Sequence, residues 1–181
     1  MNTKAKIFTL FLLSLIILSC LSGCNKATEP EKTEALAAEF SSQSKMFKRD
    51  GFSIIMDSKF EYQDSKDCSI SAINGDLTFE AFYLEKYYFT EKNKDVTSSA
   101  DALSYVNPGK DVQQNSLGLP YVEYEKVDSD GVNYTFYYVC ISDSERYWMC
   151  TFFAPTSSFE GYRAHIMDYL DTIDAVYEEE Q

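Results

Sequence analysis

Residues 68–81 read CSISAINGDLTFEA, and this stretch decides the fold class. Asn74-Gly75 is the preferred pair for a two-residue type I′ hairpin turn, because both central positions of that turn need a positive φ. Small polar residues alternate with apolar ones on both sides of the turn, as in a half-buried antiparallel ribbon. The turn predicts a register whose apolar pairs share one buried face: Ala72 with Leu77, Ile70 with Phe79, and Cys68 with Ala81.

Further strands are predicted on both sides of this hairpin. Residues 52–56 alternate between the two faces of a strand, and residues 119–127 do so again. An Asp- and Gly-rich turn at 128–131 leads into 132–141 and then 147–154. These last two stretches predict a second, aromatic-rich hairpin.

Two helices complete the pattern. Ser98 or Ser99 is a candidate N-cap for a short helix that ends at Asn107-Pro108-Gly109. The last helix, with Ser157 or Ser158 as its cap, has an apolar stripe at steps of three and four. The stripe consists of Phe159, Tyr162, Ile166, Tyr169, Leu170 and Ile173. Strands grouped beside a few helices predict an α+β domain, with a largely antiparallel β-sheet flanked by helices.

The N-terminus reads as an export signal. Lys4 and Lys6 precede the apolar run 7–21, which is short for a membrane-spanning helix. The run ends at Leu21-Ser22-Gly23-Cys24, which resembles the lipobox of bacterial lipoproteins at all four positions. The stretch 17–20 is a poorer second match, because it has a bulky leucine where a small residue is preferred.

This resemblance implies a lipid on the Cys24 sulfur and recognition of Leu21, Ser22 and Gly23 by a signal peptidase that cuts before Cys24. It therefore implies an extracytoplasmic protein whose partner is the cell membrane, through a durable lipid anchor. The alternative is an ordinary signal peptide with an incidental cysteine.

Four segments are predicted from these boundaries. Residues 1–23 are the lipoprotein signal peptide, and 24–47 are the lipidated N-terminus and a polar tether. Residues 48–176 form the folded domain, and 177–181 are an acidic tail.

The folded part resembles the PsbP-like superfamily of α/β/α sandwiches. The resemblance rests on the opening 50–54, the strand 134–141 with its aromatic partner 147–153, and the amphipathic helix from Phe159. It implies an accessory or binding role, since members include an extrinsic photosystem subunit and a nuclear-transport cofactor. Many bacterial lipoproteins of unassigned role look similar. Fold alone does not carry a function across.

Composition narrows the class of partner. The formal net charge is −13, and removal of residues 1–23 with their two lysines takes it to −15. Nucleic-acid binding needs clustered Lys and Arg, so a nucleic-acid partner is not expected. Aromatic residues make up 15% of the chain, with 14 Tyr and 13 Phe, and more tyrosines than one core can hold. These extra tyrosines indicate either sheet filling or a face that binds saccharide or protein.

No familiar catalytic centre is present in the sequence. His165 is the one histidine, and a rim position on the last helix explains it. The stretch 128–133 begins like a calcium loop but lacks the later acidic ligands, so a hairpin turn explains it better. Neither a metal nor another cofactor is expected. The leading hypothesis is a non-enzymatic binding or accessory domain. The alternatives are a hydrolase of envelope polymers, with a dispersed carboxylate and tyrosine site, and a purely structural envelope component.

One disulfide is predicted. If residues 143–147 form the loop of the second hairpin, Cys140 faces Cys150 directly, within the Cα range that a disulfide tolerates. Cys68 then stays a small apolar filler of the core. A turn shifted by one residue would instead place Cys140 and Cys150 on opposite faces.

Overall fold

A computed structural model of the chain describes residues 43–92 and 94–177. The residues predicted for signal-peptidase recognition and lipidation, Leu21, Ser22, Gly23 and Cys24, lie outside them. The elements in chain order are β1 Ser44–Arg49, β2 Phe52–Asp57, β3 Glu61–Tyr62, β4 Ile70–Asn74, β5 Leu77–Glu85, α3 Lys86–Glu91, α4 Ser99–Val106, β6 Gln113–Gln114, β7 Pro120–Val127, β8 Asn133–Ser142, β9 Arg146–Pro155, α5 Thr156–Leu170 and β10 Asp174–Ala175.

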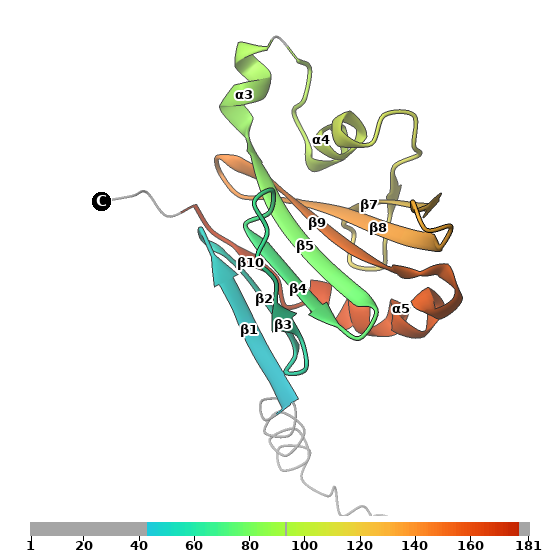
Figure 1. Cartoon of the computed structure of the whole chain (residues 1–181). Coiled ribbons are helices and arrows are strands. Elements are labelled where there is room, and N and C mark those ends of the chain that lie inside the picture. Colours follow the sequence, from blue (N-terminus) through green and yellow to red (C-terminus); the bar gives the residue numbers. More distant parts are fainter. Residues whose placement is uncertain (1–42, 93, 178–181) are drawn as a thin grey trace, which may run out of the picture. The chain divides into compact units, whose positions relative to one another are not determined.

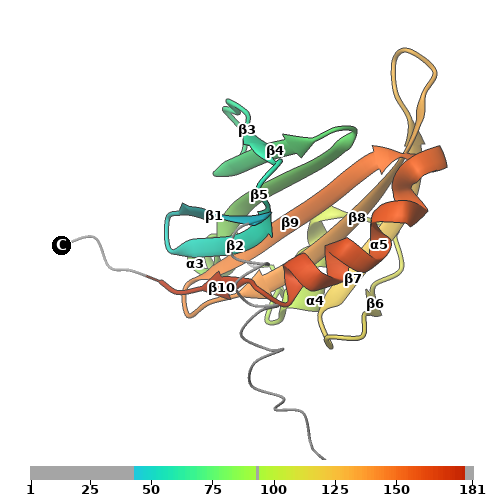
Figure 2. The same ribbon diagram turned by 90° about the horizontal axis from the view of Figure 1, so that it is seen from below.

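The domain consists of layers around a seven-stranded antiparallel sheet with the order β3-β4-β5-β9-β8-β7-β6. Helix α4 packs on one face of this sheet, against β7, β8 and β9 (Figure 1). Helix α5 crosses the other face along β8 and β9, beside the small sheet β1-β2-β10 (Figure 2). The predicted α+β class, with a largely antiparallel sheet flanked by helices, is confirmed.

Each face of the large sheet has its own apolar core. The face under α5 buries Trp148, Phe79 and Phe152 together with the apolar side chains of β2. The face under α4 buries a smaller group that includes Cys140 and Met149. Strand β9 lies at the centre of the sheet and is covered on both faces, so it has seven consecutive buried positions.

Strand β1 begins earlier than the predicted domain boundary. The sequence predicts a tether up to residue 47, but β1 starts at Ser44 and pairs along its whole length with β2. Phe47 is fully buried in the larger core. The turn between the two strands uses Asp50 and Gly51, both with positive φ, at 53° and 79°. The sequence does not predict this strand, because Phe47 is its only buried side chain and the residues around it are charged like those of a tether.

The first hairpin forms as predicted in its faces but not in its register. Asn74 pairs with Leu77, so Gly75 and Asp76 are the two turn residues. Gly75 has a φ of 62° and Asn74 is not in the positive-φ region, which is the pattern of a turn with glycine first. Each residue of β4 therefore pairs with a residue of β5 that lies two positions further along the chain than predicted. A shift by an even number of residues leaves every side chain on the predicted face of the sheet. The predicted buried set is confirmed for Ile70, Ala72, Leu77 and Phe79.

Cys68 is a correction that follows from this slip. It precedes β4 instead of pairing with Ala81, and it is half-buried. Its thiol lies near the carboxylate of Glu80, which is on the opposite face from Ala81. Burial raises the pKa of the Cys68 thiol. It is not a filler of the main core.

The predicted Cys140–Cys150 disulfide is wrong. The loop of the second hairpin is one residue shorter than assumed, because Asp143 N–H donates to the carbonyl oxygen of Arg146. Cys140 therefore faces Met149, and Cys150 faces Val139. One cysteine points into each core, and both are free thiols. The side-chain period of a strand makes a slip of one residue decisive.

The two predicted helices differ in how well their caps were anticipated. Ser98 caps α4 in a capping box with Asp101, and the helix ends at Asn107, as predicted. Helix α5 starts at Thr156 with Pro155 as its N-cap residue and has no side-chain cap. Ser158 is already inside the helix, where its hydroxyl donates to the carboxylate of Asp76.

A buried ion pair closes the end of the domain where the β1–β2 turn, the β8–β9 loop and the C-terminal strand meet. Arg146 Nε donates to Asp143 Oδ2 at 3.0 Å, and the two side chains are only 7% and 2% exposed. The remaining guanidinium nitrogens donate to the carbonyl oxygens of Asp50 and Val176. Trp148 Nε1 donates to the same Asp143 oxygen at 3.1 Å. Every charged atom of the pair is thereby matched, which is what makes a buried ion pair tolerable.

Candidate functional site

The outer edge of the large sheet is left open by the shortness of β6. That strand has two residues and pairs only with Pro120 and Tyr121 of β7. From Val122 to Val127, β7 pairs with β8 on one side, and no strand among the described residues pairs with it on the other. Natural sheets usually cover or blunt such edges, because unpaired backbone groups are a template for another strand.

Two hydrogen bonds fix which backbone groups of β7 point outward. Asp128 N–H donates to the Val132 carbonyl oxygen, so the even-numbered residues of β7 direct their backbone groups toward β8. Asn115 N–H donates to the carbonyl oxygen of Leu119, which places the odd-numbered residues on the other side. The backbone N–H and C=O groups of Glu123 and Glu125 therefore point away from β8. Within residues 43–92 and 94–177 they have no hydrogen-bond partner.

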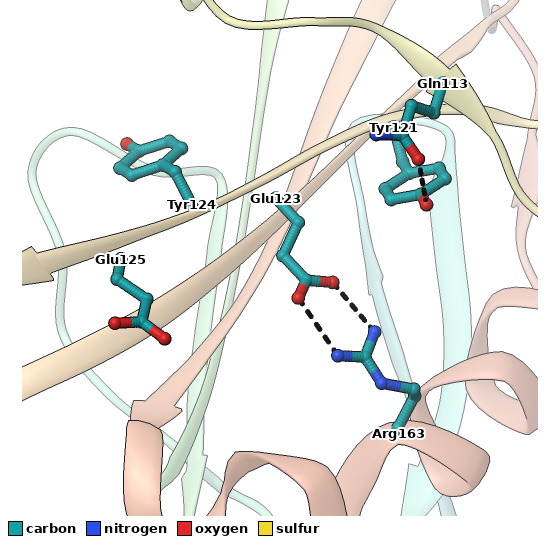
Figure 3. A pocket seen from close by; sticks show the side chains of 6 residues that line it. All are labelled: Gln113, Tyr121, Glu123, Tyr124, Glu125 and Arg163. Atoms are coloured by element: carbon teal, nitrogen blue, oxygen red, sulfur yellow. Dashed lines mark hydrogen bonds and ion pairs between the residues drawn. The ribbon is translucent and has the colours of Figure 1, made fainter.

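A pocket of about 510 Å³ opens at this same edge (Figure 3). Its lining comes from β6, β7 and α5: Gln113, Tyr121, Glu123, Tyr124, Glu125 and Arg163. Side chains alternate along a strand, so Tyr121, Glu123 and Glu125 lie on the α5 side and Tyr124 on the α4 side. Figure 3 shows Tyr124 pointing away from the Glu123 and Arg163 pair. The pocket thus reaches the strand edge from both faces of the sheet.

Arg163 links α5 to β7 across this pocket. Its two terminal nitrogens donate to the two carboxylate oxygens of Glu123 at 2.7 and 3.0 Å, and its Nε donates to Glu160 at 2.9 Å. The hydrogen bonds to Glu123 are the main cause that raises the pKa of the Arg163 guanidinium. Glu125 accepts a hydrogen bond from Asn133 Nδ2 at 2.6 Å. Three carboxylates and one guanidinium leave this side of the edge with an excess of negative charge.

The α4 side of the same edge is aromatic. Tyr124 stacks on Phe136 of β8 with ring centroids 5.5 Å apart, and Phe136 stacks on Phe153 of β9 at 5.1 Å. These three residues lie in one cross-strand row and are half-buried. Lys110 Nζ lies 4.7 Å from the centre of the Tyr124 ring. We call this row, Tyr124, Phe136 and Phe153, the aromatic row.

The abundant tyrosines divide between core and surface. Tyr137 and Tyr147 are buried, each in a different core, and are sheet filling. Tyr121 and Tyr124 are half-buried at the open edge, and Tyr138 is half-buried beside the aromatic row. Burial raises the pKa of Tyr138. Tyr87 and Tyr88 are exposed on α3, away from β7.

The other candidates from the sequence form no catalytic centre. His165 is exposed on α5 and stacks on Tyr169 with ring centroids 6.4 Å apart. Asp128 accepts the N–H groups of Asp130 and Val132, so its carboxylate is used by the hairpin turn. Among the described residues, no group of three or more His, Cys, Asp and Glu side chains is placed to hold a metal ion.

One constellation that sequence reasoning missed joins the first hairpin to α5. Asp76 accepts hydrogen bonds from the hydroxyls of Ser158 and Tyr162. These hydrogen bonds lower the pKa of Asp76, the one from Ser158 most. The contacts fix the turn at Gly75 against the helix.

No helix among the described residues is long and apolar enough to span a membrane.

No protein-family profile matches the sequence. No curated protein sequence matches it either. Solved structures are similar in fold. A crystal structure from Bacteroides thetaiotaomicron VPI-5482 matches with a TM-score of 0.52 and 17% identity, over 76% of this chain and 50% of that one. The solution structure of cyanobacterial PsbP (CyanoP) from Synechocystis sp. PCC 6803 matches with a TM-score of 0.49 and 10% identity, over 74% of this chain and 92% of that one.

This chain spans about half the length of the Bacteroides protein. At such identities the likeness concerns fold alone and carries no activity, ligand or partner to this chain.

Proposed function

We propose that this chain is an extracytoplasmic lipoprotein, held on a membrane through Cys24, whose folded domain is a non-enzymatic binding or accessory module. The anchor rests on the lipobox-like Leu21-Ser22-Gly23-Cys24. The binding role rests on one observation about the domain. At the open edge of β7, unpaired backbone groups, a polar pocket and the aromatic row meet within one short stretch of strand.

Each of these features favours binding in a different way. Unpaired N–H and C=O groups supply directional hydrogen bonds without any rearrangement of the domain. Aromatic rings offer a large contact area at low cost in side-chain entropy. A surface that combines both is suited to recognition, and most solvent-exposed sheet edges in monomeric proteins avoid this combination.

The hydrolase alternative is less well supported by the same residues. The pocket holds two glutamates, Glu123 and Glu125, as a carboxylate mechanism requires. Glu123, however, is held in a two-point ion pair by Arg163, and Glu125 is engaged by Asn133. These contacts favour a role in fixing α5 to β7.

Site-specific photo-cross-linking in the native envelope tests the binding role. A benzophenone amino acid at position 126, on the exposed end of β7, should give a discrete cross-linked species in the full lipidated chain. The matched control places it at position 87, which is also exposed but lies on α3. A species from position 126 alone supports the proposal. Equal labelling from both positions, or none from position 126, contradicts it.

A further inference from the structure

The geometry points to strand addition: we propose that the β7 edge binds an extended basic segment of a partner protein, which joins the sheet as an antiparallel strand in line with β6. This inference rests on the proposed binding role and names the kind of partner. The segment would pair with residues 123–127, the part of β7 that β6 leaves uncovered.

Backbone direction supports this arrangement. The outward N–H and C=O groups of Glu123, Glu125 and Val127 repeat at every second residue, which is the spacing that an antiparallel partner strand requires. Strand β6 already pairs antiparallel at Tyr121, so an added strand would extend the ladder that β6 begins. Peptide recognition by strand addition uses this kind of edge, with backbone hydrogen bonds for affinity and side chains for specificity.

Charge selects the side chains of the segment on the α5 side. Residues opposite Glu123 and Glu125 would have their side chains on the same face as these two carboxylates. Glu160 lies beside them, and Arg163 is the one cation in the group. Basic side chains two residues apart in the segment would therefore meet unlike charge. The whole chain, at −13, adds long-range attraction for a basic partner.

The α4 side selects the residue between the two basic ones. That residue would lie opposite Tyr124, at the end of the aromatic row. Lys110 lies over the Tyr124 ring and Lys126 follows along the strand, so a third basic side chain is disfavoured there. An aliphatic or aromatic side chain would pack on the ring instead. The expected pattern is basic, apolar, basic.

The same charges argue against a second copy of this chain as the partner. Two β7 edges paired antiparallel would bring the glutamates of one copy against those of the other. Like charges directly opposite each other in a sheet are destabilising. The glutamates thus protect the edge from self-association while leaving it open to a strand of opposite charge.

A designed peptide tests the inference on the full mature chain. The probe is an acetylated, amidated peptide of three lysines alternating with three valines, titrated against the protein by nuclear magnetic resonance. In the proposed pairing the N–H groups of the lysines point toward β7 and those of the valines point to solvent. Methylation of the backbone nitrogens of the three lysines should weaken binding at least tenfold. Methylation of the backbone nitrogens of the three valines should leave the affinity within about twofold.

Two further probes fix the role of charge. A glutamate and valine peptide of the same length should not bind at protein concentrations that saturate the lysine peptide. Binding of the lysine peptide should weaken as salt is raised, because these charges are exposed to solvent. Strand addition by a basic segment is wrong if the lysine and glutamate peptides bind with equal affinity. It is also wrong if methylation of the lysine and of the valine backbone nitrogens weakens binding equally.

Protein variants provide an independent check. Glu125→Pro removes one outward N–H, a change that sheet edges tolerate, and Glu125→Ala removes only the side chain. The proline variant should bind the lysine peptide at least tenfold more weakly than the alanine variant, with circular dichroism confirming that both are folded. If the proline variant does not fold, the N-methylated peptides still decide with the unaltered protein. If the lysine peptide fails to bind while the position 126 cross-link persists, strand addition by a basic segment is wrong and the proposed binding role stands.

Discussion

Replacement of Gly51 by alanine should destabilise the domain far more than the same change at Gly131. Both glycines have a positive φ, 79° and 83°, so each alanine variant carries the cost of that backbone region, roughly 1–2 kcal/mol. No atom lies within 4 Å of the new Cβ at Gly131. At Gly51 the new Cβ would lie 2.0 Å from the carbonyl oxygen of Val176. The chain at Val176 must therefore move away from the β1–β2 turn.

That movement breaks two hydrogen bonds. Val176 N–H donates to the Gly51 carbonyl oxygen at 2.9 Å, and Arg146 Nη2 donates to the Val176 carbonyl oxygen at 3.3 Å. A neutral hydrogen bond contributes about 1 kcal/mol and one with a charged donor about 2 kcal/mol. With the backbone cost included, Gly51→Ala should lower the free energy of unfolding by about 4–5 kcal/mol. Gly131→Ala should lower it by only the backbone cost, about 1–2 kcal/mol.

Urea unfolding, followed by the fluorescence of the single tryptophan, Trp148, measures both values. Trp148 is fully buried in the larger core and reports directly on its loss. The Gly131 variant controls for the backbone cost, so the difference between the two variants isolates the contact with Val176. Equal losses of stability in Gly51→Ala and Gly131→Ala would refute the account of how the C-terminal strand is held.

Three further predictions concern the anchor, the buried ion pair and the thiols. Cys24→Ala should leave the protein as an uncut precursor without label from a radioactive fatty acid, and labelling at the wild-type level would show that another residue is lipidated. Burial alone would raise the pKa of Asp143, but hydrogen bonds from backbone N–H groups and the indole, with the charge of Arg146, hold it below its usual range. The stability that this pair contributes is therefore present above pH 3.8 and is lost as the pH falls through the lowered pKa. Asp143→Asn should lower the free energy of unfolding by roughly 3 kcal/mol at pH 7, and urea titrations at acid pH should show a smaller difference from the wild type. A difference below about 1 kcal/mol at pH 7 would argue against a stabilising pair. Cys140 and Cys150 should both be alkylated in denatured, unreduced protein. In the folded state they should react slowly, because burial raises the pKa of both thiols. If mass spectrometry of the denatured, unreduced protein finds neither thiol alkylated, the two cysteines form a disulfide after all.

The strands and helices that bury a regular apolar pattern could be predicted from the sequence. The first hairpin, the strands β7 to β9 and helix α4 all combine such a pattern with a turn or cap signal. Strand β1 was missed because only Phe47 among its side chains is buried, and charged neighbours resemble a tether. Register was the weak point in both hairpins. Turn chemistry fixes it to within a residue or two, and one residue was enough to separate Cys140 from Cys150.

The candidate site could not be predicted from the sequence, since it depends on what is absent beside β7. The alternation in 119–127 predicts a strand with Glu123 and Glu125 on one face and Tyr124 on the other. It does not tell that the neighbouring strand stops after two residues, or that Arg163 arrives from α5 to bind Glu123. Both are long-range facts of topology. The signal available was the excess of tyrosines, which indicated a surface without locating it.

Amide hydrogen exchange along β7 tests the open edge most directly, and it needs no knowledge of the partner. In the free mature protein the amides of Glu123 and Glu125 should exchange quickly, because they point to solvent. The amides of Tyr124 and Lys126, which donate toward β8, should be protected. On addition of the lysine and valine peptide, the fast pair should slow while the protected pair stays unchanged. Equal protection of all four amides in the free protein would contradict the account, because the edge of β7 would then already be paired.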